Sequence, residues 1–197
     1  MNYIKPSAFL LAGMILIAGC TPVPKSPMHL FPDEKGQEGY YRLKDSGVFE
    51  SKAIKISVSL LEKTNPELDP MVSALLDKDF VVVRMDIVNY SPVRAMYNPA
   101  YTALMSDSFD YRKPLDYTDI YDMTANIPGF ENGIAKLKGK FYDLNETVNP
   151  GEKSSKLLIF KPLSKDIKTA ELSIKEVYIG TETIRLTFPF VLKAKVI

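Results

Sequence analysis

The side chains that most often act as nucleophiles or general bases are scarce in this chain. His29 is the only histidine, and Cys20 is the only cysteine. A Ser-His-Asp arrangement needs a histidine that is fixed by packing and oriented by a carboxylate. His29 lies instead in a proline-rich stretch, between Pro27 and Pro32. We therefore predict a protein without catalytic residues rather than an enzyme.

Carboxylates are the remaining groups with possible chemistry. Five aspartates lie close together: Asp107, Asp110, Asp116, Asp119 and Asp122. Calcium prefers such oxygen ligands, but the segment lacks the Asp-x-Asp-x-Asp-Gly pattern of a calcium loop. We expect acids of a solvated loop and no metal or other cofactor, and calcium binding by residues 107–122 stays open. A carboxylate pair across a cleft, as in glycoside hydrolases, is an alternative. Because the chain has 24 acidic residues, its composition cannot identify which two would form such a pair.

Aromatic residues give the clearest candidates for recognition. Six tyrosines lie within residues 90–121: Tyr90, Tyr97, Tyr101, Tyr111, Tyr117 and Tyr121. Tyrosine combines a large apolar ring with a hydroxyl group and loses few rotatable bonds on binding, which suits recognition surfaces. We predict that these tyrosines form a surface for another protein or a glycan. The alternative is that half or more of them cover the core, with the hydroxyl group in water.

The single cysteine follows a segment with a pattern of its own. Lys5 is the only charged residue before Cys20, and residues 8–19 are apolar or small. A charged start, an apolar run of about 7–15 residues and small residues before a cleavage point are typical of a secretory signal. A membrane-spanning helix needs about 20 apolar residues, so this run is too short. We predict a signal peptide over residues 1–19.

The end of this segment resembles the lipobox of bacterial lipoproteins, in which an aliphatic residue and two small residues precede a cysteine, here Ile17-Ala18-Gly19-Cys20. The resemblance implies that Cys20 becomes the first residue and carries the lipid that holds the chain on a membrane. In enteric-type bacteria, lipoproteins without Asp after that cysteine go to the outer membrane, and Thr21 stands here. We expect a cell-envelope protein on the outer membrane, facing the periplasm or the surface, rather than on the inner membrane. The alternative is an ordinary signal and a free thiol.

The charges of the chain are balanced. It has 25 Lys or Arg and 24 Asp or Glu, and removal of residues 1–19 takes away Lys5, which leaves 24 of each. Nucleic-acid binding proteins usually carry a basic excess, so we expect no nucleic-acid partner. Because Cys20 is alone, the fold must be stable without an internal disulfide bond.

Residues 20–39 have the composition of a linker. Four prolines stand in this stretch: Pro22, Pro24, Pro27 and Pro32. Proline-rich segments favour extended, semi-rigid conformations. We predict that residues 20–39 form a lipidated cysteine and a tether, and that residues 40–197 form one folded domain. The alternative is a loop that packs on the domain through Met28, Leu30 and Phe31.

Alternation of apolar and polar residues indicates strands in residues 40–197. The clearest lie in residues 54–60, 80–90, 157–160, 170–179 and 183–196. In residues 80–90 we expect Val81, Val83, Met85 and Ile87 to face a core. We also expect weaker strands over residues 100–105 and 137–144, and a short helix after Asp69-Pro70.

Two irregularities stand out in the last two strands. The apolar phase slips between Ile174 and Val177, which indicates a β-bulge. Gly180-Thr181-Glu182 predicts a hairpin turn. Pro189 lies in the middle of the last strand, which places that strand at an edge or at a bulge because proline donates no hydrogen bond.

About seven short strands separated by turns predict an all-β protein, an immunoglobulin-like antiparallel β-sandwich with one short helix. Three features resemble the immunoglobulin-like domains of exported bacterial lipoproteins: the valine-rich strand that ends in Asn89-Tyr90-Ser91, the turn Pro150-Gly151-Glu152, and the apolar strand that ends in Phe160. The resemblance implies a fold and a location and no residue-level chemistry.

These observations favour a membrane-anchored, non-catalytic binding module for another envelope protein or a glycan. Two alternatives remain. The domain could be a structural subunit of an envelope complex, pairing with a partner strand at the edge that contains Pro189. It could also be a carboxylate-dependent envelope hydrolase.

Overall fold

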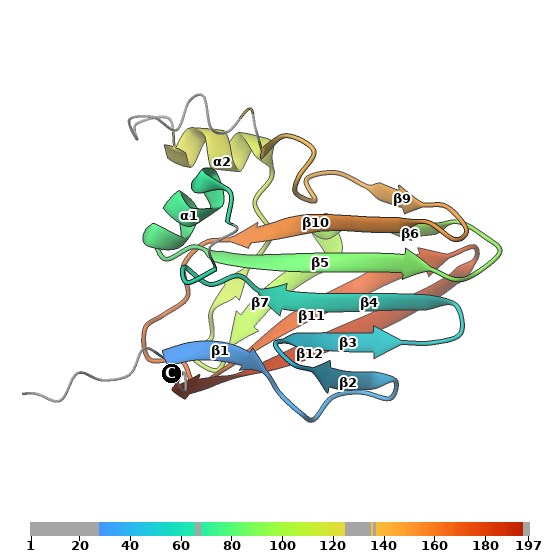
Figure 1. Cartoon of the computed structure of the whole chain (residues 1–197), viewed down its shortest axis with the longest axis horizontal. Helices are drawn as coiled ribbons and strands as arrows, with labels where there is room; N and C mark the ends of the chain where they lie inside the picture. The colour runs from blue at the N-terminus through green and yellow to red at the C-terminus, as the bar shows by residue number, and fades with distance from the viewer. Residues whose placement is uncertain (1–27, 66–67, 125–134, 136, 195–197) are drawn as a thin grey trace, which may run out of the picture.

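The computed structural model describes residues 28–65, 68–124, 135 and 137–194, and Figure 1 shows its elements. The described part contains twelve strands, two α-helices and one 3-10 helix. The named strands pair only in antiparallel fashion. The all-β antiparallel sandwich is thus confirmed, with more strands than predicted. The signal peptide and Ile17-Ala18-Gly19-Cys20 lie outside the described residues.

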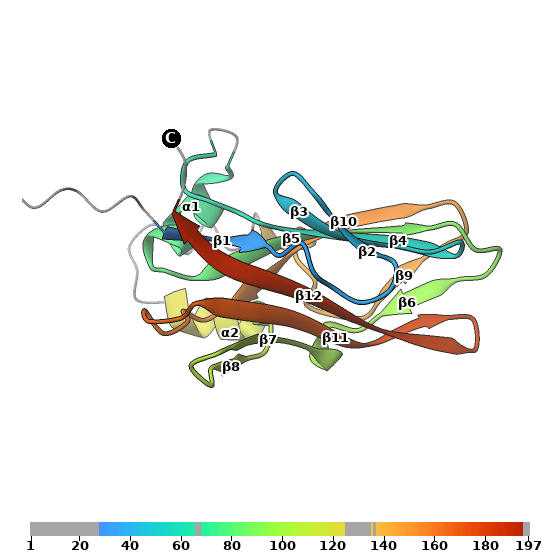
Figure 2. The same ribbon diagram turned by 90° about the horizontal axis from the view of Figure 1, so that it is seen from below.

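Two sheets face each other, as the side view in Figure 2 shows. The first sheet contains β1 (Met28–Pro32), β6 (Ala95–Tyr97), β7 (Thr102–Ser106), β8 (Tyr111–Arg112), β9 (Glu146–Val148), β11 (Thr169–Ile179) and β12 (Glu182–Ala194). The second contains β2 (Tyr40–Leu43), β3 (Ser46–Glu50), β4 (Ile54–Leu60), β5 (Val81–Asn89) and β10 (Lys153–Phe160) in the order β10-β5-β4-β3-β2. The 3-10 helix η1 (Pro99–Tyr101) connects β6 to β7.

The main core lies between the sheets. As predicted, Val83, Met85 and Ile87 of β5 are completely buried, and Val81 packs against the same cluster. Facing them are the inward side chains of β11 and β12, which include Leu172, Ile174, Leu186, Phe188 and Phe190. The alternation in the sequence predicted this core because each strand presents one face to the opposite sheet.

The long hairpin of β11 and β12 follows the prediction in detail. Its register shifts between Ile174 and Val177, where the bulge was expected. The connecting turn contains Gly180 with a φ of 62°. This left-handed conformation suits glycine because a β-carbon would be strained there.

The prediction of a tether over residues 20–39 was wrong for residues 28–39. Met28–Pro32 forms β1, which pairs with the last part of β12, from Met28 with Ala194 to Pro32 with Phe190. Leu30 packs against the main core. The packed alternative is therefore correct here, and the folded domain begins by Met28 rather than at Tyr40.

The outer edge of β12 is also bound by this segment. The backbone N–H of Asp33 donates to Pro189 O at 2.9 Å. The Gln37 side chain accepts from Thr187 N at 2.8 Å and donates to Arg185 O at 3.2 Å, as a neighbouring strand would. Pro189 therefore lies at the side of β12 away from β11, where a missing N–H breaks no ladder bond. Edge pairing with a partner strand would have to displace residues 33–37.

Two helices lie at one end of the sandwich, near the ends of β5 and β10 (Figure 1). α1 (Pro70–Asp77) begins as predicted, with Asp69 Oδ1 accepting from Met71 N at 2.9 Å. α2 (Tyr117–Thr124) was not predicted. Together they bury Val72, Leu75, Ile120 and the outward-facing Val82 of β5 in a second hydrophobic cluster.

The predicted strand over residues 137–144 is not present. Among the described residues of this segment, only Phe141 makes a bridge, to Leu157. Leu137 and Phe141 belong to the second cluster, whereas the Tyr142 ring lies in the main core. The imperfect spacing of these apolar residues reflects packing against two different cores.

Candidate functional site

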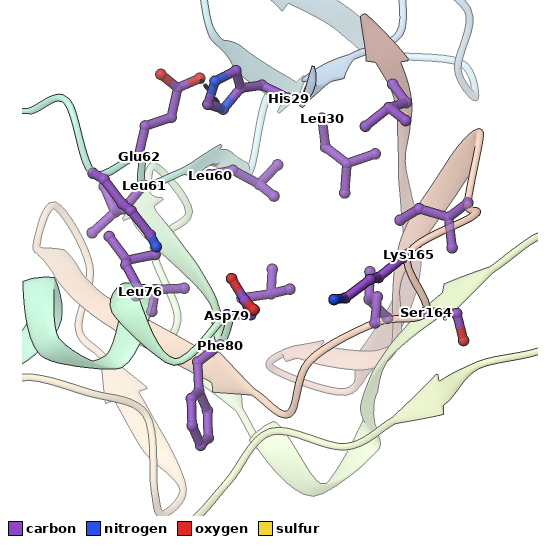
Figure 3. Close-up of a pocket in the computed structure, with 16 residues that line it drawn as sticks. His29, Leu30, Leu60, Leu61, Glu62, Leu76, Asp79, Phe80, Ser164 and Lys165 are labelled. Carbon is purple, nitrogen blue, oxygen red and sulfur yellow. Dashed lines mark ion pairs between the residues drawn. The ribbon is translucent and has the colours of Figure 1, made fainter. Parts of the chain in front are cut away.

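A cavity of about 400 Å³ opens between the two sheets at one end of the sandwich, and we call it the end pocket (Figure 3). Six segments meet around it: β1, the end of β4, the end of α1, the start of β5, the connection from β10 to β11, and the end of β12. Its apolar lining residues are Leu30, Leu60, Leu61, Leu76, Phe80, Val81, Val82, Leu163, Ile167 and Leu192. The size and lining are typical of a site for a small molecule or a side chain of a partner.

Charged and polar side chains stand among these apolar residues. They are His29, Glu62, Lys63, Asp79, Ser164 and Lys165. In Figure 3, Lys165 and Asp79 extend from opposite walls toward the centre of the pocket. Lys63 also pairs with Asp77 of α1 at 3.5 Å. The pocket thus combines an apolar wall with groups of both charges, which would orient a bound amphipathic molecule.

His29 lies at the mouth of this pocket and not in a tether. Its Nδ1 is 3.6 Å from Glu62 Oε1, and about a quarter of each side chain is exposed (24% and 23%). Its Nε2 is buried and has no hydrogen-bond partner among the described residues. A catalytic base needs a nearby nucleophile as well as an orienting carboxylate, and Ser164 is the only hydroxyl-bearing residue among the described residues that line the pocket. Among the described residues, Ser164 donates hydrogen bonds from N and Oγ to Asp110, and no hydrogen bond joins it to His29.

The end pocket was missed in the sequence analysis. Its lining comes from residues as far apart as His29 and Leu192, and no local pattern marks residues that only the topology brings together. One signal was available, the apolar Met28, Leu30 and Phe31 within the proline-rich stretch. That signal indicated packing on the domain but not a pocket.

One predicted binding residue is part of the core. Tyr97 is 1% exposed, and its ring meets that of Tyr142 edge to face with a centroid distance of 5.1 Å. Its hydroxyl lies 2.8 Å from Thr102 Oγ1. Burial raises the pKa of the Tyr97 hydroxyl. Tyr97 therefore cannot contact a partner on the folded surface, and the alternative of a core role is correct for it.

The other five tyrosines do not gather on one surface. Tyr90 follows β5 at the end of the sandwich away from the end pocket, whereas Tyr117 and Tyr121 belong to α2 at the other end (Figure 1). Tyr111 lies in β8, and Tyr101 ends η1. About half of the surface of Tyr90, Tyr101, Tyr111 and Tyr121 is exposed, and Tyr117 packs against the second cluster. A role for each in binding stays a prediction, but a single tyrosine surface is not formed.

Two acids of the 107–122 segment hold the turn after β7. Both carboxylate oxygens of Asp107 accept from Lys168 N, at 3.0 and 3.2 Å. Asp110 is buried and accepts from Ser164 N at 2.9 Å, Ser106 Oγ at 2.9 Å and Arg112 Nη2 at 2.7 Å. The N–H of Ser164, the Ser106 and Ser164 hydroxyls and the Arg112 charge hold the pKa of Asp110 below its usual value. These carboxylates are occupied in joining the turn to the loop before β11.

Asp116 and Asp119 have a different role. Asp116 Oδ1 accepts from Asp119 N at 2.8 Å, and Asp119 Oδ2 accepts from Asp116 N at 3.3 Å. This reciprocal pair is a capping box at the start of α2. No cluster of three or more metal-ligating side chains occurs within the described part of the chain. The prediction of solvated acids is wrong for Asp110, which is buried, whereas Asp107, Asp116 and Asp119 are exposed and also stabilise local structure.

Within residues 28–194, apart from the gaps stated above, no helix has the length and apolar character needed to cross a membrane.

Comparisons with known proteins give few matches. No family model matches the chain, and no curated protein matches it. Among solved structures it is similar to the yjhA protein from Bacillus subtilis, with 14% identity, a TM-score of 0.40, and coverage of 65% of this chain and 76% of that one. It is also similar to a conserved hypothetical protein from Bacillus anthracis, with 12% identity, a TM-score of 0.35, and coverage of 81% and 96%.

Proposed function

We propose that this protein is a lipid-anchored, non-catalytic binding module of the cell envelope, and that its end pocket receives the apolar part of an amphipathic ligand. The observation that supports the ligand site is the cavity of about 400 Å³, in which ten of the sixteen lining residues are apolar and come from both sheets and the segments between them. Burial of apolar ligand surface against such walls is favourable by about 25 cal/mol per Å². The charged side chains that line the pocket would bind a polar end of the ligand.

The lining favours an apolar ligand over a glycan. Phe80 is the only Phe, Tyr or Trp among the described residues that line the pocket. A sugar presents hydroxyl groups that need donors and acceptors when they leave water. The aliphatic residues Leu60, Leu163 and Leu192 supply neither. A segment of an envelope protein with an exposed apolar side chain would also satisfy this lining.

The lipid anchor comes from the sequence. Cys20 stands eight residues before Met28, where the described domain begins. In this proposal the acyl chains on Cys20 hold the domain on a membrane, and Thr21 favours the outer membrane, with the domain facing the periplasm or the surface. Several acyl chains give stable anchoring, whereas one chain is marginal.

The hydrolase alternative has less support. It needs one carboxyl group with a raised pKa as general acid and a second that stays ionised. Among the described acids whose pKa departs from the usual value, Glu50 and Asp110 both have a lowered pKa, in each case because neighbouring groups donate hydrogen bonds to the carboxylate. Neither lines the end pocket.

Binding of an apolar probe tests the pocket. Residues 20–197 with Cys20→Ser, which carry no lipid, would be titrated with the fluorophore N-phenyl-1-naphthylamine. We expect a saturable rise in emission that is lost in Leu163→Arg and in Leu61→Arg, two separate walls of the pocket. Leu144→Arg is the control, since Leu144 is 74% exposed and lies outside the pocket. Equal binding by all four chains, with folding confirmed by circular dichroism, would refute this ligand site.

A further inference from the structure

Phe109 is the most exposed large apolar residue of the described chain. It lies in the turn between β7 and β8, and 98% of its surface is accessible. Its φ of 62° is a left-handed conformation that bulky residues rarely adopt. The carboxylates of Asp107 and Asp110, on either side of it, bind the loop before β11. The turn therefore presents the ring outward from a fixed position.

The register of the first sheet places this turn at the end where the chain enters the domain. Met28 pairs with Ala194 of β12, and Thr169 of β11 pairs with Val191. Ala170 in turn pairs with Ser106 of β7. The start of β1, the end of β12, the start of β11 and the 107–110 turn consequently share one end of the sheet, as Figure 2 shows for the strands.

The length of chain before β1 limits how far this end can stand from the lipid. Seven residues lie between Cys20 and Met28, and a fully extended chain over these eight steps spans about 29 Å at most. β1 and β7 are three strand spacings apart, with β12 and β11 between them, which is about 14 Å. Phe109 is thus within reach of any surface to which Cys20 is anchored.

We propose that the 107–110 turn is a second membrane contact, in which the Phe109 ring inserts into the interface of the membrane that carries the lipid on Cys20. This inference rests on the proposed lipid anchor. A single acyl anchor site leaves the domain free to rotate, and a ring inserted beside it fixes which end faces the lipid. His29 of β1 and Leu192 of β12, which line the end pocket, lie at the same end of the sheet, so this contact would bring the pocket close to the membrane.

Electrostatic attraction to acidic lipids contributes little to the proposed contact between the 107–110 turn and the membrane. Lys165 and Lys168 are exposed in the loop beside the turn, but Asp166 stands between them and is also exposed. A basic patch would attract acidic lipid, whereas this alternation does not. We expect Phe109 to insert equally into zwitterionic and acidic membranes.

The absence of tryptophan from the chain permits a direct test. The full lipidated protein with Phe109→Trp would be reconstituted into vesicles of phosphatidylethanolamine and phosphatidylglycerol that contain lipids brominated on the acyl chains. We expect the indole emission to shift to shorter wavelength and to lose most of its intensity to the bromine. Tyr90→Trp, at the opposite end of the sandwich, should lose none.

Any other result of this experiment contradicts the proposed insertion of Phe109. Emission that is unquenched in Phe109→Trp places the ring in water, and a shift without quenching places it against protein, so either result refutes membrane insertion. The intact mass of the same sample reports the lipid on Cys20. A lipidated chain without quenching refutes only the second contact, whereas an unlipidated chain refutes the anchor and this inference together.

Discussion

His29 Nδ1 lies 3.6 Å from Glu62 Oε1, and this contact joins the first strand of the domain to the segment that follows β4. It places the only histidine at the mouth of the end pocket, in a stretch whose prolines are typical of a linker. The contact also connects the two sheets at this end of the sandwich, since β1 belongs to the first sheet and β4 to the second.

The first prediction concerns the stability of this contact. His29 Nε2 is buried without a described partner, and such an atom costs about 1–3 kcal/mol. The partly exposed contact with Glu62 adds at most about 1 kcal/mol to the unfolding free energy. We therefore expect His29→Leu to raise the unfolding free energy by about 1 kcal/mol in urea titrations, with His29→Gln as the polar control. A loss of more than about 1 kcal/mol would show that the pair is structurally important.

The second prediction separates core from surface among the tyrosines. Tyr97→Ala should lower the unfolding free energy by about 3–5 kcal/mol because it empties a buried aromatic site. Tyr101→Ala, at an exposed ring of the same segment, should change it by less than about 0.5 kcal/mol. Tyr97→Phe should cost about 1 kcal/mol through the lost contact with Thr102. Equal effects of both alanine variants in urea titrations would contradict this assignment.

The third prediction concerns Asn89, which is completely buried at the end of β5. Its Nδ2 donates to Val93 O at 2.7 Å and Val148 O at 2.9 Å, and its Oδ1 accepts from Ser91 N at 3.0 Å and Ser91 Oγ at 2.7 Å. At about 1 kcal/mol for each bond, Asn89→Ala should cost about 3–4 kcal/mol. The control is Asn98→Ala, which removes one exposed cap worth about 1 kcal/mol. Similar losses for the two variants would refute the network.

The fourth prediction is a pH dependence. Because the pKa of Asp110 is lowered from its usual 3.8 in the folded state, the unfolded chain binds its proton more tightly. The contribution to stability is therefore present above about pH 4 and is lost as the pH falls through the folded pKa. Asp110→Asn should destabilise the protein at pH 7, and in urea titrations this difference should shrink as the pH falls below about 4. Asp45→Asn, in the exposed turn between β2 and β3, should have little effect across this pH range.

Much of the sandwich could be predicted from the sequence because one face of each long strand is buried. Ile54, Ile56 and Val58 alternate with polar residues in the sequence, and all three are completely buried. The β-bulge after Ile174 was predictable because the apolar alternation shifts phase there. The helix after Asp69-Pro70 was predictable for a similar reason, since a cap and a first-turn proline act locally.

The missed elements depend on distant partners. β1 is five residues long and ends in Pro32, so its own sequence is a weak strand signal. It is a strand because the end of β12 offers an unpaired edge, more than 150 residues along the chain. Val82 faces outward from β5 and is nonetheless buried, because α1 and α2 cover that face. Alternation alone would have placed Val82 in water.

Residue type also misled the prediction of the site. Tyrosine is common both on binding surfaces and at the margins of cores, and nothing near Tyr97 in the sequence distinguishes the two. The pair of Ala95 and Tyr97 faces inward while Met96 is exposed, but a three-residue strand is too short to show a period. The end pocket has walls from six segments, and its one local signal, the apolar residues of the proline-rich stretch, indicated packing and not a pocket.

The most direct test is native mass spectrometry of the protein purified from the membranes of cells that produce it. We expect a chain that starts at Cys20, carries a covalent lipid, and retains a non-covalent amphipathic molecule that Leu163→Arg fails to retain. A chain that still contains residues 1–19, with an unmodified Cys20 and no retained molecule, would contradict the account of a lipid-anchored binding module.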